Sequence, residues 1–367
     1  MRKNGGKIGY FKVFFTKSPL CVDLFIGLVY HKGMENEERR KRFKSAQNMV
    51  ALLLFTLFAG QTVCSFPIVG LQLLESHISY EAYTYLYTGV TGFLYLIYML
   101  LPLVLASFIG KRSFLSFAKW RGKTHKPVAT ALFCLGIMYV GQLAASKTAM
   151  LFERLFGVDI YASLPSYHVS GVGFLLLSLL CTAVFPAFLE EMLMRGAVLS
   201  YLMPYGKSFA VIMCGCLFGL MHLNPIQLPF ACIAGIAMAY VTVETGNIRT
   251  AVAVHFVNNS LSVIMTYLQN EMSPAAYGTL GSIVDITVFA LGALSCLYLI
   301  RGKKSLADPA ADHPSVDVRE TEKVELDKKR PLFNLSLGMA AYLIFAAGYT
   351  LFTLGSLLLN TVLLEFL

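Results

Sequence analysis

Stretches of about 17–25 mostly apolar residues recur along the whole chain, and a helix of that length crosses the hydrocarbon core of a bilayer. They lie near residues 48–74, 83–109, 128–147, 169–189, 208–223, 226–243, 248–268, 279–300 and 335–363. Hydrophobic residues make up 56% of the chain and charged residues 14%, whereas a soluble domain carries about a quarter charged residues. Free backbone groups find no partner in lipid, so spans of this length must be helical. The sequence predicts an all-α, polytopic transmembrane helical bundle of about eight or nine spans.

The formal net charge of +9 gathers in three stretches: before Asn48, from Lys111 to Lys126, and from Arg301 to Arg330. Because basic loops stay on the cytoplasmic side, this pattern predicts a multi-pass protein of the cell membrane with a cytoplasmic N-terminus and an exterior C-terminus. Charge used for orientation is not expected to bind nucleic acid. The sequence does not indicate an oligomeric state.

Composition divides the chain into five parts. We expect a basic cytoplasmic or interfacial segment, N-terminal spans, a transmembrane core, a charged disordered linker and a last span, at residues 1–47, 48–164, 165–300, 301–334 and 335–367.

Two adjacent carboxylates, Glu190 and Glu191, follow an apolar run in which each costs about 2.5–3.5 kcal/mol at the bilayer centre. Residues four apart share a helix face, so Glu191 is expected to pair with Arg195, whereas Glu190 points about 100° away. Pro186, four residues before Glu190, can kink the helix. We therefore expect Glu191 to be anchored and Glu190 to be left for chemistry.

Two histidines, His222 and His255, also lie in apolar stretches. Phe218 shares a face with His222, and Asn259 shares one with His255, while Asn258 is expected to turn aside. Imidazole and carboxamide one helical turn apart are a credible pair of donors to an oxyanion. Asp285, isolated in another span, is interpreted as polar packing or a lid contact.

These three elements, Glu190-Glu191-x-x-x-Arg195, Phe218-x-x-x-His222 and His255-x-x-x-Asn259, resemble the signature motifs of the CPBP family. This family comprises the CAAX proteases and bacteriocin-processing enzymes, also called Abi proteins. The resemblance covers roughly residues 165–300. It implies an intramembrane endopeptidase that acts on a membrane-associated peptide or protein, with Glu190, Glu191, His222, His255 and Asn259 as its catalytic residues. Arg195 and Phe218 would support them.

Two mechanisms fit those residues. In the first, Glu190 and His222 activate water while His255 and Asn259 stabilise the oxyanion, and no metal is needed. In the second, Glu190, His222 and His255 hold a zinc ion and Glu191 acts as the base. No HExxH sequence is present, and Arg195 already engages Glu191, so we favour the metal-free mechanism.

Two other functions remain open. A catalytically idle member of the same fold would regulate or bind a partner, such as a sensor kinase or a bacteriocin target. A proton-coupled transporter would use the same buried groups, but transporters show internal repeats and none is visible here. The compact loops look bacterial, so bacteriocin immunity or leader-peptide processing is expected rather than cleavage of prenylated proteins. Catalysis also requires a helix that continues beyond Leu189 to about residue 203, since otherwise Glu190 and His222 lie at different depths.

Overall fold

A computed structural model describes residues 37–111, 113–118, 126–156, 171–301 and 335–365. Within these ranges every regular element is a helix, and eight helices are long and apolar enough to cross a membrane. The prediction of a polytopic helical bundle is confirmed. The predictions for most of segment 1–47 and for linker 301–334 fall outside the described residues.

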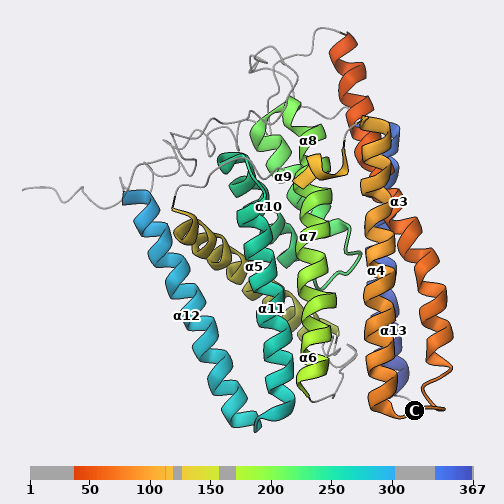
Figure 1. The fold of residues 1–367 in the computed structure, drawn as a ribbon, viewed down its shortest axis with the longest axis vertical. Helices are drawn as coiled ribbons and strands as arrows, with labels where there is room; N and C mark the ends of the chain where they lie inside the picture. The colour runs from red at the N-terminus through yellow and green to blue at the C-terminus, as the bar shows by residue number, and fades with distance from the viewer. Residues whose placement is uncertain (1–36, 112, 119–125, 157–170, 302–334, 366–367) are drawn as a thin grey trace, which may run out of the picture.

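The helices follow one another in the order shown in Figure 1. The long ones are α3 (Glu37–Gln72), α4 (Tyr80–Gly110), α5 (Pro127–Phe156), α10 (Leu228–Thr245), α11 (Arg249–Glu271), α12 (Pro274–Arg301) and α13 (Leu337–Glu365). The shorter ones are η1 (Phe114–Ala118), α6 (Val172–Leu179), η2 (Leu180–Val184), α7 (Phe185–Glu191), η3 (Met192–Val198), α8 (Leu199–Leu202), η4 (Met203–Tyr205) and α9 (Lys207–Leu220).

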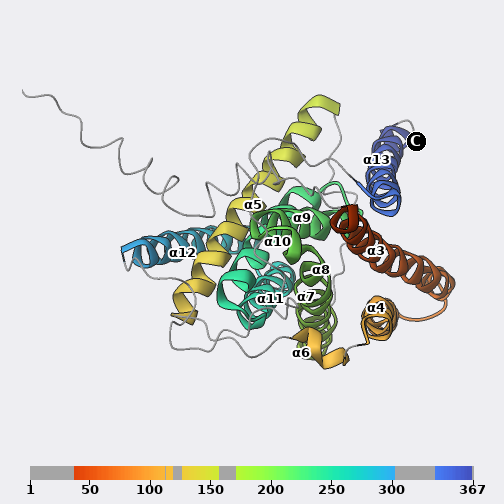
Figure 2. The ribbon, with the colours of Figure 1, turned by 90° about the horizontal axis from the view of Figure 1, so that it is seen from above.

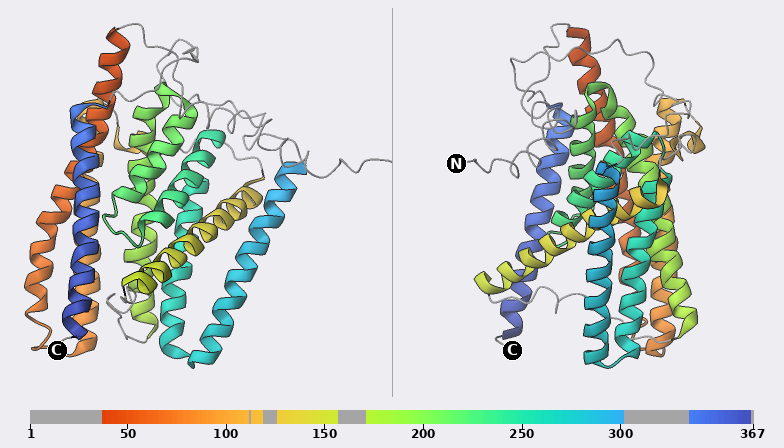
Figure 3. Two further views of the ribbon diagram at one scale, coloured as in Figure 1. Left: turned by 180° about the vertical axis from the view of Figure 1, so that it is seen from behind. Right: turned by 90° about the vertical axis from the view of Figure 1, so that its left-hand side faces the viewer.

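One rod of consecutive helical segments, from α6 to η4, runs through the middle of the bundle. In Figures 1 and 2, α3, α4 and α13 lie on one side of it, and α5 and α12 lie on the other. Helix α5 runs obliquely across its neighbours (Figure 3) and packs against α10 and α12. Its backbone closely approaches that of α12 where two glycines meet. A Cβ built on Gly136 would lie only 2.7 Å from the Cα of Gly292.

The central rod is continuous over 34 residues, Val172–Tyr205, so the expected extension of this helix beyond Leu189 is confirmed. Two π-helical segments, η2 and η3, flank the short α7 that carries both glutamates. Wide helical turns of this kind recur at functional sites because they change the direction of the side chains that follow. Because the rod extends from Val172 to Tyr205, Glu190 lies near its middle rather than at its end.

The apolar stretch 208–223 was predicted to be a complete span, and this is wrong. Helix α9 has 14 residues, about 21 Å, and is too short for a hydrocarbon core of about 30 Å. It ends because Leu223 has a positive φ of 52° and the side chain of Asn224 accepts hydrogen bonds from the backbone N–H of Ile226 and Gln227. The chain then returns in α10, so the turn after α9 lies inside the bundle.

Helices α9 and α10 pack backbone to backbone through small residues. A Cβ built on Gly215 would lie 2.3 Å from Ile236 Cγ1, and one built on Gly235 would lie 2.8 Å from the carbonyl oxygen of Gly215. Close approach of this kind is the usual packing of small residues between helices in lipid. It holds the turn after α9 against the central rod.

Basic residues gather at one end of the bundle. Helices α3, α5 and α13 begin at this end, and α4, α8 and α12 end there (Figure 1). Its lysines and arginines with described side chains are Lys41, Arg42, Lys44, Lys111, Lys126, Lys207, Arg249 and Arg301. The opposite end carries Glu75, Glu81 and Glu271, with Lys147 and Arg154 on the far half of α5.

Candidate active site

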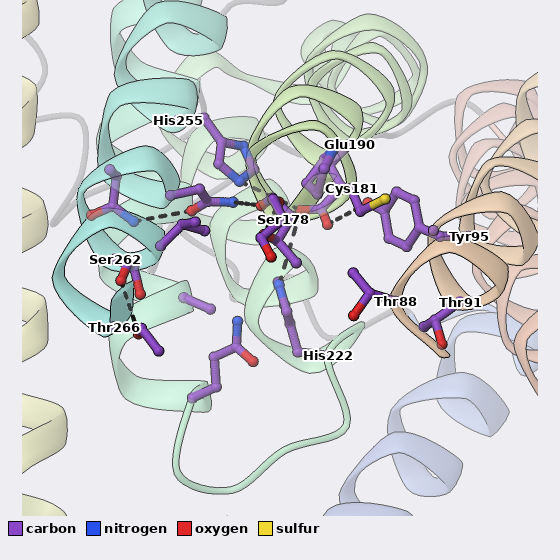
Figure 4. Close-up of a pocket in the computed structure, with 18 of the residues that line it drawn as sticks. Thr88, Thr91, Tyr95, Ser178, Cys181, Glu190, His222, His255, Ser262 and Thr266 are labelled. Carbon is purple, nitrogen blue, oxygen red and sulfur yellow. Dashed lines mark hydrogen bonds and ion pairs between the residues drawn. The ribbon is translucent and has the colours of Figure 1, made fainter. Parts of the chain in front are cut away.

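Three side chains from separate elements converge near the middle of the central rod. Glu190 comes from α7, His222 from the turn after α9, and His255 from α11. The Nε2 atoms of His222 and His255 lie 4.0 Å and 3.9 Å from Oε2 of Glu190, and Figure 4 shows both imidazoles reaching this carboxylate. The short α9 brings His222 to the depth of Glu190, which resolves the difference in depth expected from straight spans.

The second ring nitrogen of each histidine has its own acceptor. Nδ1 of His222 donates to the carbonyl oxygen of Phe218 at 2.7 Å, and Nδ1 of His255 donates to Oε1 of Glu191 at 2.9 Å. In the neutral rings each Nε2 then carries a lone pair directed toward Glu190. Oε2 of Glu190 is buried and has no hydrogen-bond donor among the described residues. Three acceptors thus face one gap, and a water molecule is the simplest donor that fills it.

Glu191 and Arg195 form the predicted ion pair, with Oε1 and Nη1 2.8 Å apart and both side chains fully buried. Nη2 of Arg195 also donates to the carbonyl oxygen of Gly235 at 3.1 Å, and its guanidinium lies 4.4 Å from the ring centroid of Phe218. Through Glu191 this buried cluster orients His255. Glu191 itself does not line the cavity described below.

Tyr95 on α4 is a site residue that sequence reasoning missed. Its hydroxyl donates to Oε1 of Glu190 at 2.7 Å, from the side of the carboxylate opposite the histidines (Figure 4). No sequence motif distinguishes this tyrosine from others in apolar spans, and it lies 95 positions before Glu190 in the chain. Only the packing of α4 against α7 reveals the contact.

Asn259 lies in the site but already has a structural partner. Pro186 has no N–H to give to the carbonyl of Thr182, four residues earlier, and Nδ2 of Asn259 donates to that carbonyl at 3.0 Å. Asn258 was expected to turn aside, and this is wrong. It lines the same cavity and donates from Nδ2 to Oδ1 of Asn259 at 3.1 Å. One N–H of Asn259 remains for a ligand.

A cavity of about 600 Å³ opens at these residues, between α4, the central rod, α10 and α11. One wall is apolar and includes Phe230, Ala231 and Ala234. The wall formed by α11 is polar and continues from His255 along one helix face through Asn258, Asn259, Ser262, Thr266 and Asn270. The volume accommodates several residues of an extended peptide, and the polar face offers partners to its backbone.

The spacing of Glu190 and the two histidines does not match that of zinc ligands. Two donors at about 2.0–2.1 Å in a tetrahedral zinc site lie about 3.3 Å apart. The two separations here are 3.9 Å and 4.0 Å. In the part of the chain that the structure describes, no three His, Cys, Asp or Glu residues are grouped as metal ligands. The gap therefore accommodates a water molecule without movement of the donors, whereas zinc would require them to contract.

Comparison with known proteins identifies one segment of the chain. Residues 172–261, about a quarter of the chain, match a family model described as type II CAAX prenyl endopeptidase Rce1-like. No curated protein and no solved structure matches the chain. The matched segment contains Glu190, His222, His255 and Asn259, whereas Tyr95 lies outside it.

Proposed function

Because residues 172–261 form a domain of the CPBP family of CAAX proteases, we propose that this chain is an intramembrane endopeptidase. It would hydrolyse peptide bonds of membrane-associated peptides or proteins. The observation that carries the proposal is the buried Oε2 of Glu190, which faces both histidine Nε2 atoms at about 4 Å inside a peptide-sized cavity. A carboxylate in this arrangement would take a proton from water, which supports the proposal.

The proposed reaction begins with a water molecule held between Glu190 and Nε2 of His222. As the water oxygen attacks the scissile carbonyl carbon, its proton moves to Glu190 and the carbonyl electrons move onto oxygen. The resulting oxyanion would accept a hydrogen bond from Nδ2 of Asn259. It would accept a second from Nε2 of His255 only in the form of the ring that carries a proton on both nitrogens, with Glu191 as the partner of Nδ1–H. When the carbonyl re-forms, the C–N bond breaks and Glu190 returns the proton to the leaving amine.

Both histidines are expected to be essential, without dependence on a metal. His222→Ala and His255→Ala should each lower kcat by about 10²-fold or more, because one orients water and the other stabilises the oxyanion. Peptide cleavage by the detergent-purified protein, with and without a zinc chelator, provides the measurement. If the chelator abolished cleavage by the wild type and added zinc restored it, the metal-free mechanism with Glu190 as the base would be wrong and a metal-dependent mechanism would take its place.

Tyr95 is proposed to position the carboxylate of Glu190. Tyr95→Phe removes one hydrogen bond to a charged group, a contact of about 1.5–3 kcal/mol, so we expect kcat to fall about ten-fold or more with little change in KM. Steady-state kinetics on an uncharged peptide measures the change, and the thermal unfolding midpoint controls for folding. An unchanged kcat would show that this hydroxyl only packs against the site.

We propose that the protein lies in the cell membrane and that the basic end of the bundle faces the cytoplasm, with the N-terminus on that side.

The idle, partner-binding alternative makes a different prediction. In that case Glu190→Ala would leave the effect on the partner unchanged, whereas a peptidase loses its effect. A bacterial source remains a prediction from the compact loops, and a link to bacteriocin immunity remains a prediction from the resemblance.

A further inference from the structure

Asp285 is an ionisable residue singled out in the sequence that the proposed mechanism does not use. It lies near the middle of α12, where an unpaired carboxylate is costly. In the described parts of the chain, Asp285 makes no hydrogen bond or ion pair, and it lines the same cavity as Tyr139. Ionisable residues retained at this depth mark a binding or transport function more often than packing.

Asp285 lines a second cavity of about 600 Å³, between α5, α11 and α12. This cavity shares several of its lining residues with the cavity of the candidate active site, among them Thr182, Asn258, Asn259, Ser262 and Thr266. The two cavities therefore meet along the polar face of α11, beside the residue proposed to bind the oxyanion. An extended peptide, at about 3.3 Å per residue, that crosses this face would place one side of its scissile bond in each cavity.

The two cavities differ in charge. Apart from tyrosines and Cys181, the titratable groups among the described residues that line the first cavity are Glu190, His222 and His255. Among the described residues that line the second, Asp285 is the sole Asp, Glu, Lys, Arg or His, and the other polar groups are amides and hydroxyls such as Gln142, Ser146 and Tyr277. A single carboxylate in an otherwise uncharged pocket binds a cation far better than a neutral or acidic group.

We infer that the second cavity holds the residues on one side of the scissile bond, and that Asp285 there selects a basic side chain of the substrate. The inference rests on the proposed peptidase function and adds a specificity determinant to it. Lysine and arginine are the residues this pocket would accept, with an ammonium or guanidinium facing the carboxylate.

A peptide series tests this directly. Each member carries lysine, glutamine or glutamate at one position within four residues of the scissile bond, and kcat/KM is measured with purified protein. At one position the wild type should prefer lysine to glutamine by roughly ten- to a hundred-fold. Asp285→Asn should bring that ratio close to one, and Asp285→Lys should reverse the preference toward glutamate.

Glu271→Gln is the matched control, since it removes one negative charge at the end of α11 without touching the second cavity. It should keep the wild-type ratio. Cleavage with the same lysine-to-glutamine ratio in wild type and Asp285→Asn would overturn the inference and leave the peptidase function standing. Undiminished cleavage by Glu190→Gln would instead overturn the peptidase mechanism.

Binding gives a second measurement that does not depend on turnover. The lysine and glutamine peptides are titrated against Glu190→Gln and against the Glu190→Gln/Asp285→Asn double variant. The first should bind the lysine peptide at least ten-fold more tightly than the glutamine peptide, and the double variant should not discriminate. Equal affinities for both peptides in the first variant would contradict the role of Asp285.

Discussion

Glu190→Gln should lower kcat for peptide cleavage by about 10²- to 10⁴-fold while the protein stays folded. Glutamine occupies the same volume and still accepts a hydrogen bond from Tyr95, but it cannot take a proton from water. The effect is expected on kcat rather than KM, because Glu190 acts on the attacking water and not on the bound peptide. Steady-state cleavage of an uncharged membrane peptide by the detergent-purified variant measures it.

Two comparisons make this result specific. Glu271→Gln, a change of the same chemistry at the end of α11, should retain wild-type activity. The thermal unfolding midpoint of Glu190→Gln should stay near that of the wild type, since the substitution removes a buried charge and leaves no cavity. If Glu190→Gln cleaved as fast as the Glu271→Gln control, the proposed general base would be wrong.

Arg195→Met should destabilise the fold by about 3–5 kcal/mol, the largest stability effect expected in this chain. Both partners of the Glu191–Arg195 pair are fully buried, so removing the cation leaves the carboxylate of Glu191 without its main counter-ion. The carbonyl of Gly235 and the ring of Phe218 also lose their contact with the guanidinium. Unfolding of the purified protein in a denaturing detergent series reports the change in free energy.

The double variant Glu191→Gln/Arg195→Met distinguishes loss of the charge pair from loss of packing. Removing both charges should leave the protein more stable than Arg195→Met alone, because no isolated buried charge remains. Peptidase activity should not return, since the double variant lacks the negative charge of Glu191 that supports His255 when both ring nitrogens carry a proton. Equal destabilisation of the single and double variants would show that volume, not charge, determines stability here.

The helical periodicity of the motifs predicted much of the site. Spacing of four placed Arg195 against Glu191, and Phe218 against His222, and the structure shows both contacts. These predictions succeed because they are local, each depending on one helical turn. The assignment of the catalytic roles, and the five-part division of the chain, remain predictions from the sequence.

Three features could not be predicted from the sequence in this way. Hydropathy does not register that Leu223 and Asn224 end α9 early, and this end decides the depth of His222. The hydrogen bond from Tyr95 depends on how α4 packs against α7, and no local pattern encodes that packing. Asn258 and Asn259 both line the cavity because the polar face of α11 is wide, whereas a spacing of four residues from His255 indicates only Asn259.

Cleavage in H₂¹⁸O tests the central claim most directly. Purified wild type and Glu190→Gln are incubated with a membrane-peptide library, and the products are analysed by mass spectrometry. The account predicts that wild type produces new carboxyl termini, each carrying one ¹⁸O atom, and that Glu190→Gln produces almost none. Unlabelled products, equal product from both proteins, or no product from wild type with any membrane peptide would contradict it.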